Sequence, residues 1–105
     1  IAKSNESRMK GLSGLKSLSN DKAMLFVFDE IGDYGIWMKD MKFPLDIMWL
    51  NEQKEIIHLE QGISPDTFPK VYYPKEKSVY VLETNAGFAK NNNLTVGKVL
   101  DFDLK

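Results

Sequence analysis

The sequence predicts an α+β, β-dominated domain: a small, mostly antiparallel curled sheet or barrel with one N-terminal helix and one short C-terminal helix. From residue 23 onward, five or six short apolar or alternating runs are separated by turns rich in Asn, Asp, Gly and Pro. Only two segments, one before residue 23 and one near residue 90, are predicted as helices. The 105 residues suffice for a single hydrophobic core, so we expect residues 1–105 to form one domain.

The predicted N-terminal helix covers residues 4–16. Ser4 can cap it, Glu6 lies in its first turn, and three apolar residues fall near one stripe: Met9, Leu12 and Leu15. Gly11 and Gly14 are possible breaks in this helix.

The first strands follow from a change to period two. Residues 24–28 predict a strand that is buried on both faces, residues 29–33 a turn, and residues 34–39 the next strand. Residues 45–50 predict a further strand, with Leu45, Ile47 and Trp49 on one face and Asp46 on the other. The polar residues 51–54 then form a tight turn into a strand over residues 55–60, which predicts a hairpin.

The second half begins with a long connection. Residues 61–77 contain three of the four prolines, and a loop of this length in a small domain is usually functional or mobile. Residues 78–84 predict a strand and residues 86–93 a short helix. At the end, Leu100, Phe102 and Leu104 alternate with Asp101 and Asp103, which predicts apolar residues inward and acidic residues outward.

Composition excludes several classes of function. The net charge of −1 gives no electrostatic basis for nucleic-acid binding. The absence of cysteine excludes thiol catalysis, and the single histidine, His58, excludes an ordinary multi-histidine zinc site. Methionine thioethers can bind copper, but strand methionines usually fill cores. We therefore predict no metal and no cofactor, and we find no apolar run that is long enough for a transmembrane segment.

Three charged residues in or beside apolar strands are the best candidates for chemistry: Lys39, Asp46 and Glu83. If they converge near Trp37, a carboxylate could act as general base and the lysine could stabilise a developing anion. The structural alternative is an ion-pair network that fixes strand register.

Aromatic residues form a second candidate set. Flat rings next to polar groups can stack on sugars or hold an apolar ligand. We expect the strand tryptophans, Trp37 and Trp49, to pack in the core, and we regard Tyr72 and Tyr73 as better candidates for exposure. The candidate ligand-binding residues are Trp37, Lys39, Asp46, Tyr72, Tyr73 and Glu83.

Several separated motifs together resemble one family. They are Arg8 with Gly11-Leu12, the run Met24-Leu25-Phe26, Trp37-Met38-Lys39 followed by Pro44-Leu45-Asp46-Ile47, and Val81-Leu82-Glu83 with Ala86-Gly87, Leu94 and Gly97. In order and spacing the chain resembles the uncharacterised prokaryotic family called domain of unknown function 192, from about Ile1 to Gly97. It departs from the family pattern at Ser13, where methionine is usual, and in the hairpin turn at residues 51–54, which is usually rich in Asp and Gly.

The resemblance implies an extracytoplasmic protein, in the cell envelope or secreted, with a signal or lipoprotein segment upstream of Ile1. It also implies a strand before the first helix, of which Ile1-Ala2 would be the end. It supplies no catalytic residues, because none are established for the family.

The sequence thus predicts a non-catalytic ligand-binding or accessory module that is a monomer. Its partner would be a small molecule, a glycan or a protein. Two alternatives stay open: a hydrolase or lyase that uses Lys39 with Asp46 or Glu83, and a protein–protein interaction scaffold that pairs through an exposed sheet edge.

Overall fold

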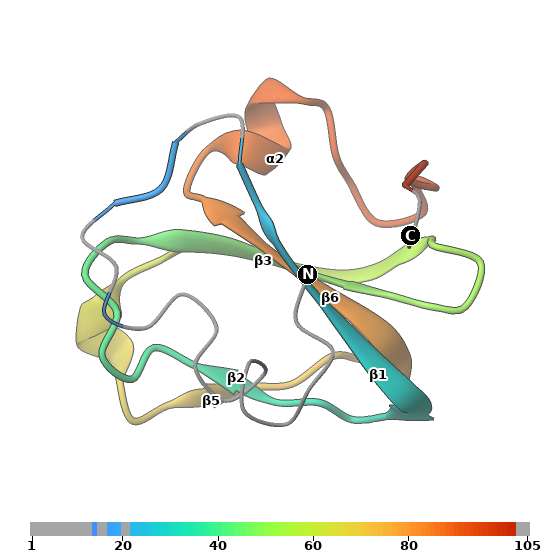
Figure 1. Cartoon of the computed structure of the whole chain (residues 1–105), viewed down its shortest axis with the longest axis horizontal. Coiled ribbons are helices and arrows are strands. Elements are labelled where there is room, and N and C mark those ends of the chain that lie inside the picture. Colours follow the sequence, from blue (N-terminus) through green and yellow to red (C-terminus); the bar gives the residue numbers. More distant parts are fainter. Residues whose placement is uncertain (1–13, 15–16, 20–21, 103–105) are drawn as a thin grey trace.

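A four-stranded antiparallel sheet forms the centre of the molecule, in a computed structural model that describes residues 14, 17–19 and 22–102 (Figure 1). Its strand order is β1-β6-β3-β4. The strands are β1 (Met24–Gly32), β3 (Leu45–Leu50), β4 (Ile56–Ile63) and β6 (Ser78–Asn85). Every neighbouring pair is antiparallel, and β3 and β6 are the inner strands.

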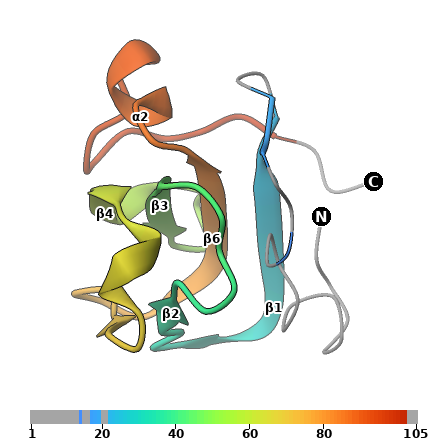
Figure 2. The same ribbon diagram turned by 90° about the vertical axis from the view of Figure 1, so that its left-hand side faces the viewer.

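Smaller elements lie on either side of this sheet. A two-stranded ribbon pairs β2 (Ile36–Trp37) with β5 (Val71–Tyr72), and the 3-10 helix η1 (Pro65–Thr67) precedes β5. The short helix α2 (Phe88–Asn91) follows β6. Figure 2 shows the ribbon near one face of the sheet and α2 near the other.

Side-chain alternation divides the core into two clusters, one on each face of the sheet. Odd-numbered residues of β3, such as Ile47 and Trp49, join Phe26 and Val81 in the cluster that faces the ribbon. The even-numbered Met48 and Leu50 join Ala89 and Leu94 in the cluster beneath α2. All six residues of β3 are buried. This central strand therefore contributes to both clusters at once.

The structure confirms a mostly β, antiparallel fold with a short C-terminal helix. The strand over residues 45–50, the turn after it and the hairpin partner are confirmed. The barrel alternative is wrong for the described residues, because β1 and β4 are the two edges of an open sheet. The predicted helix over residues 4–16 lies outside the described residues, except for Gly14, which is in a turn.

The predicted turn over residues 29–33 is wrong, because β1 continues through it to Gly32. The register with β6 shifts between Val27 and Gly32, so the intervening polar residues bulge out and remain exposed. The Tyr34 ring stacks on Phe28, with ring centroids 3.6 Å apart, and the Tyr34 hydroxyl donates to the Glu30 carbonyl. These contacts hold the bulge in place.

The predicted strand over residues 34–39 is reduced to two residues, and it lies outside the central sheet. The reason is its partner: Ile36 pairs with Tyr72 and Trp37 with Val71, within the segment that the sequence suggested as a loop. The long connection over residues 61–77 is accordingly shorter than expected, since β4 extends to Ile63 and β5 interrupts the rest.

The C-terminal segment runs along the start of β4. The Ile56 amide donates to the Lys98 carbonyl, and the Leu100 amide donates to the Lys54 carbonyl. Leu100 and Phe102 pack against the cluster beneath α2, and Asp101 is exposed, as the alternation predicted for these residues. Among the described residues, the structure holds no helix that is long and apolar enough to cross a membrane.

Candidate functional site

The two buried carboxyl groups of the sheet, Asp46 and Glu83, lie on opposite faces. Glu83 is directly opposite Ile47 in the register, so its side chain faces the cluster on the ribbon side. Asp46 is one residue earlier than Ile47 on β3 and therefore points to the α2 side. The structure thus does not bring these two candidate residues together.

Three backbone amides donate hydrogen bonds to the Asp46 carboxylate. Its Oδ1 accepts the Gly62 amide at 2.9 Å, and its Oδ2 accepts the amides of Gly87 at 3.1 Å and Ala89 at 3.0 Å. Both glycines have positive φ angles, +63° and +95°. The carboxylate therefore joins β4 and the start of α2 to β3. Its oxygens are directed at these amides and not at an open surface.

Glu83 is 5% exposed, and no hydrogen bond to its carboxyl group is found among the described residues. Burial raises the pKa of its carboxyl group from 4.5 to about 8. No charge or hydrogen bond from the described residues counters this effect. The carboxyl group is therefore largely protonated at neutral pH.

Lys39 lies apart from both carboxyl groups, in the exposed turn after β2. Its Nζ is 5.6 Å from the centroid of the Trp37 ring, at cation–π distance. Of the six candidate residues, Lys39, Trp37, Tyr72 and Tyr73 are thus on or beside the β2–β5 ribbon.

The ribbon presents aromatic side chains to solvent. The exposed fractions are 46% for Trp37, 43% for Phe68 and 59% for Tyr73. The Trp37 and Phe68 rings are in tilted contact, with centroids 5.1 Å apart. We call the outward surface made by Trp37, Phe68, Val71 and Tyr73 the aromatic surface.

The expectation of a buried Trp37 is wrong, whereas Trp49 is buried as predicted. Successive residues of a strand point to opposite faces, and Ile36 occupies the inward position of β2. Trp37 must therefore point outward. The indole of Trp49, in contrast, donates from Nε1 to the Tyr34 carbonyl at 2.8 Å.

Gly35 allows the aromatic surface to pack closely. A Cβ atom on this residue would lie 2.6 Å from Val71 Cγ1 and 2.7 Å from Tyr73 Cε1. Both distances are too short for any larger residue without a local shift. Lys70, which the sequence did not single out, places its Nζ 4.8 Å from the centroid of the Tyr72 ring.

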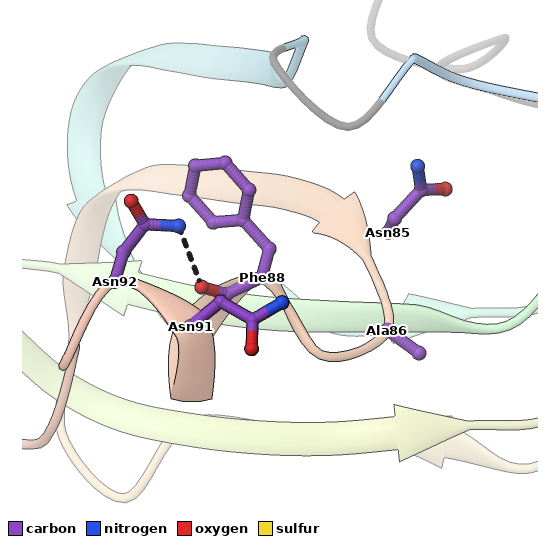
Figure 3. A pocket seen from close by; sticks show the side chains of 5 residues that line it. All are labelled: Asn85, Ala86, Phe88, Asn91 and Asn92. Carbon is purple, nitrogen blue, oxygen red and sulfur yellow. Dashed lines mark hydrogen bonds between the residues drawn. The ribbon is translucent and has the colours of Figure 1, made fainter.

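A pocket lies where β6 leads into α2, and the sequence did not indicate it. It has a volume of about 440 Å³ and is lined by Asn85, Ala86, Phe88, Asn91 and Asn92. In Figure 3 the Phe88 ring lies between the amide groups of Asn85 and Asn92. The sequence predicts only a short helix over residues 86–93, which includes the run of three asparagines at residues 91–93. No feature of that run alone reveals a pocket.

The described residues contain no group of three or more side chains suited to hold a metal ion. His58 instead packs its ring edge-on to Trp49, and its Nε2 is 2.8 Å from an oxygen of Glu60.

The comparisons with known proteins identify a family but no activity. The model of the family described as domain of unknown function 192, an uncharacterised conserved region, matches residues 1–102. No curated protein matches the chain.

Two solved structures are similar to the chain. One is described as a "putative transcription regulator" from Sinorhizobium meliloti 1021, with 29% identity and a TM-score of 0.86; the match covers 91% of this chain and 74% of that one. The other is a protein of unknown function from Novosphingobium aromaticivorans DSM 12444, with 21% identity and a TM-score of 0.90, covering 96% and 71%. The second likeness concerns the fold alone. The family match shows that the chain belongs to domain of unknown function 192.

Proposed function

We propose that this member of domain of unknown function 192 is a non-catalytic binding module and that its ligand site is the aromatic surface. The observation that carries the proposal is the exposure of Trp37, Phe68 and Tyr73 on or beside one short ribbon. Large apolar side chains gathered on a surface commonly mark an interaction site. Their ordered packing, with the Trp37 and Phe68 rings in contact, offers a preformed platform.

A glycan is the ligand class that this surface fits best. Exposed rings offer flat apolar faces on which a sugar ring can stack, while neighbouring polar groups bind its hydroxyls. The ammonium groups of Lys39 and Lys70 lie beside the rings of Trp37 and Tyr72. The positive charge of Lys70 favours a saccharide that carries carboxylate groups.

The geometry supports the enzyme alternative less well. That alternative requires Lys39 to act with Asp46 or Glu83. The Asp46 carboxylate accepts three backbone amides and points to the α2 side of the sheet. Glu83 faces the ribbon side, but it is only 5% exposed. A general base needs a free lone pair within reach of its substrate.

Titration of the 15N-labelled protein with neutral and uronate-containing oligosaccharides tests the proposal. We expect chemical-shift changes centred on the Trp37 indole and on residues 68–73, with tighter binding of the uronates. Trp37→Ala should abolish binding while leaving the fold intact, because the side chain is half exposed. Val96→Ala, which removes an exposed aliphatic side chain outside the aromatic surface, is the control.

A flat titration across both sugar classes would contradict the glycan assignment. If instead the protein self-associates in sedimentation experiments and Trp37→Ala dissolves the assembly, the aromatic surface is a protein interface. That result would support the scaffold alternative and overturn the prediction that the protein is a monomer.

We further propose that the module acts outside the cytoplasm. Cell-envelope glycans would be within its reach there, and the absence of cysteine is compatible with an oxidising compartment. Fractionation of cells that express the full-length gene product tests this, and recovery in the cytoplasmic fraction alone would contradict it.

A further inference from the structure

Two hollows share a wall on the side of the sheet away from the aromatic surface. The hollow at the end of β6, which we call the amide pocket, has a volume of about 440 Å³. A second hollow of about 500 Å³, the apolar pocket, lies beside it. Phe88 and Asn92 line both. Each volume falls in the range of small-molecule sites.

The amide pocket is polar but uncharged. None of its described lining residues is ionisable, and three of them carry primary amides that can donate and accept hydrogen bonds. The Asn92 amide donates from Nδ2 to the Phe88 carbonyl at 2.9 Å, which fixes its orientation (Figure 3). The Asn85 amide donates to the Leu18 carbonyl. The exposed Asn91 amide lies beside them on α2.

The apolar pocket has the opposite character. Carbon side chains from β1, β6, α2 and the C-terminal segment dominate its lining: Leu25, Leu82, Phe88, Leu94, Leu100 and Phe102. Asp101 is the one charged residue of its described lining, and it is exposed. An alkyl chain placed here would replace water on apolar surface, which is favourable.

The wall between the two pockets is firmly held. The Asp46 carboxylate accepts the amides of Gly87 and Ala89 at the start of α2, and the Leu94 amide donates to the Ala89 carbonyl at 2.8 Å. Ala89 and Leu94 are both buried in the cluster beneath α2. The shared wall is therefore anchored from below, and the two hollows keep a fixed relation to each other.

We propose that the two pockets form one binding site for a neutral amphiphile, with an alkyl chain in the apolar pocket and an uncharged, hydroxyl-rich head in the amide pocket. A charged head would lose its hydration without gaining an opposite charge from the amide pocket. A neutral head exchanges its water contacts for amide hydrogen bonds. The proposal is independent of the aromatic surface.

NMR titration with n-octyl β-D-glucoside, kept below the concentration at which it forms micelles, tests the site. We expect shift changes at residues 85–92 and at Leu82 and Leu100. Octanoate and octylammonium, which have similar chains and charged heads, should each bind at least about fivefold more weakly. Butyl glucoside should also bind more weakly, because each buried methylene contributes to affinity.

Two variants of α2 form a matched pair. Asn91→Ala should weaken binding of the octyl glucoside about fivefold, as expected for one lost hydrogen bond. Lys90→Ala, on the same helix but outside both pocket linings, should leave it unchanged. Alanine is a better helix former than either residue, so both variants should fold.

Trp37→Ala separates this site from the proposed glycan site. It should not change the shifts that octyl glucoside causes at residues 85–92, Leu82 and Leu100. Equal binding of all three head groups, or shift changes confined to the aromatic surface, would overturn the proposal. Failure of oligosaccharides to bind the aromatic surface would leave it standing.

Discussion

Asp46 and Glu83 are buried carboxyl groups on neighbouring inner strands, but their surroundings differ in hydrogen-bond donors. Asp46, on the α2 side, is surrounded by three backbone amides. Glu83, on the ribbon side, lies among apolar neighbours, and burial raises the pKa of its carboxyl group to about 8. Burial is similar for both, with exposed fractions of 0% and 5%. The two carboxyl groups differ in the number of backbone amides that donate hydrogen bonds to them.

The difference shows how irregular backbone determines which hydrogen bonds a buried carboxyl group receives. The amides of Gly62 and Gly87 are free to reach Asp46 because both residues adopt positive φ, at a strand irregularity and before a helix. Glu83 is within a regular ladder, where it pairs with Met24 on one side and Ile47 on the other. Neighbouring amides there are committed to strand pairing.

The largest effect should come from removing the Asp46 carboxylate. Asp46→Ala leaves three backbone amides without their acceptor, and each unsatisfied donor costs about 1–3 kcal/mol. We expect the free energy of unfolding to fall by about 3 kcal/mol or more in urea denaturation. Glu83→Gln is the matched control on the other face. A loss below about 1 kcal/mol for Asp46→Ala would show that water replaces the carboxylate at little cost.

The next effect is a pH dependence that arises from Glu83. Between pH 4.5 and about 8 the folded state holds one proton that the unfolded state has released. The stability that this proton on Glu83 contributes is complete below pH 4.5 and is lost as the pH rises toward 8. The slope is about 1.4 kcal/mol per pH unit for one proton.

The difference between the wild-type protein and Glu83→Gln, measured by urea denaturation at pH 5, 6, 7 and 8, isolates this contribution. The variant should gain in relative stability as the pH rises. A difference that does not change with pH would mean that Glu83 ionises normally in the folded protein.

A smaller effect should follow from Gly62→Ala. The φ angle of +63° is unfavourable for alanine by about 1–2 kcal/mol, although a Cβ atom there meets nothing within 4 Å. If this strain acts by displacing the amide from Asp46, the loss should be smaller in the Asp46→Ala background. A double-mutant cycle measures this coupling, and strict additivity would separate the glycine from the carboxylate.

The smallest effect is expected at Ser78, at the opposite end of β6 from Asn85. Its hydroxyl is buried, and no hydrogen-bond partner is found for it in the described part of the chain. Ser78→Ala should be neutral or should stabilise the protein by up to about 1 kcal/mol in thermal unfolding. A clear loss of stability would reveal a hydrogen-bond partner for this hydroxyl. It would also weaken the inference that hydrogen-bond partners decide how the removal of a buried polar group changes stability.

The strand at the centre of the fold was accessible from sequence because its pattern is local. Leu45, Ile47 and Trp49 alternate with Asp46, and this alternation alone places the aspartate on the opposite face. Residues 29–33 were misassigned because a polar stretch with a glycine is typical of a turn. Here the same residues extend an edge strand beyond its regular pairing, where polar side chains remain in water.

The candidate site was partly predictable for the same reason. Tyr72 and Tyr73 were recognised in a loop rich in proline and aromatics, but the ribbon forms only when β5 meets β2. That long-range pairing makes Trp37 an outward residue. The separation of Asp46 from Glu83 depends on the register between β3 and β6, and one sequence does not specify that register.

The C-terminal segment has a consequence for self-association. Residues 97–100 bond to Lys54 and to Ile56, the first residue of the edge strand β4, and the Lys54 ammonium donates to the Phe102 carbonyl. These residues occupy backbone donors and acceptors at this edge and so hinder the addition of a strand from another molecule. A protease that cut after Asn93 would free backbone donors and acceptors beside the apolar residues Ile56 and Ile57. Such nicked molecules should aggregate by strand addition at concentrations where the intact chain stays dispersed.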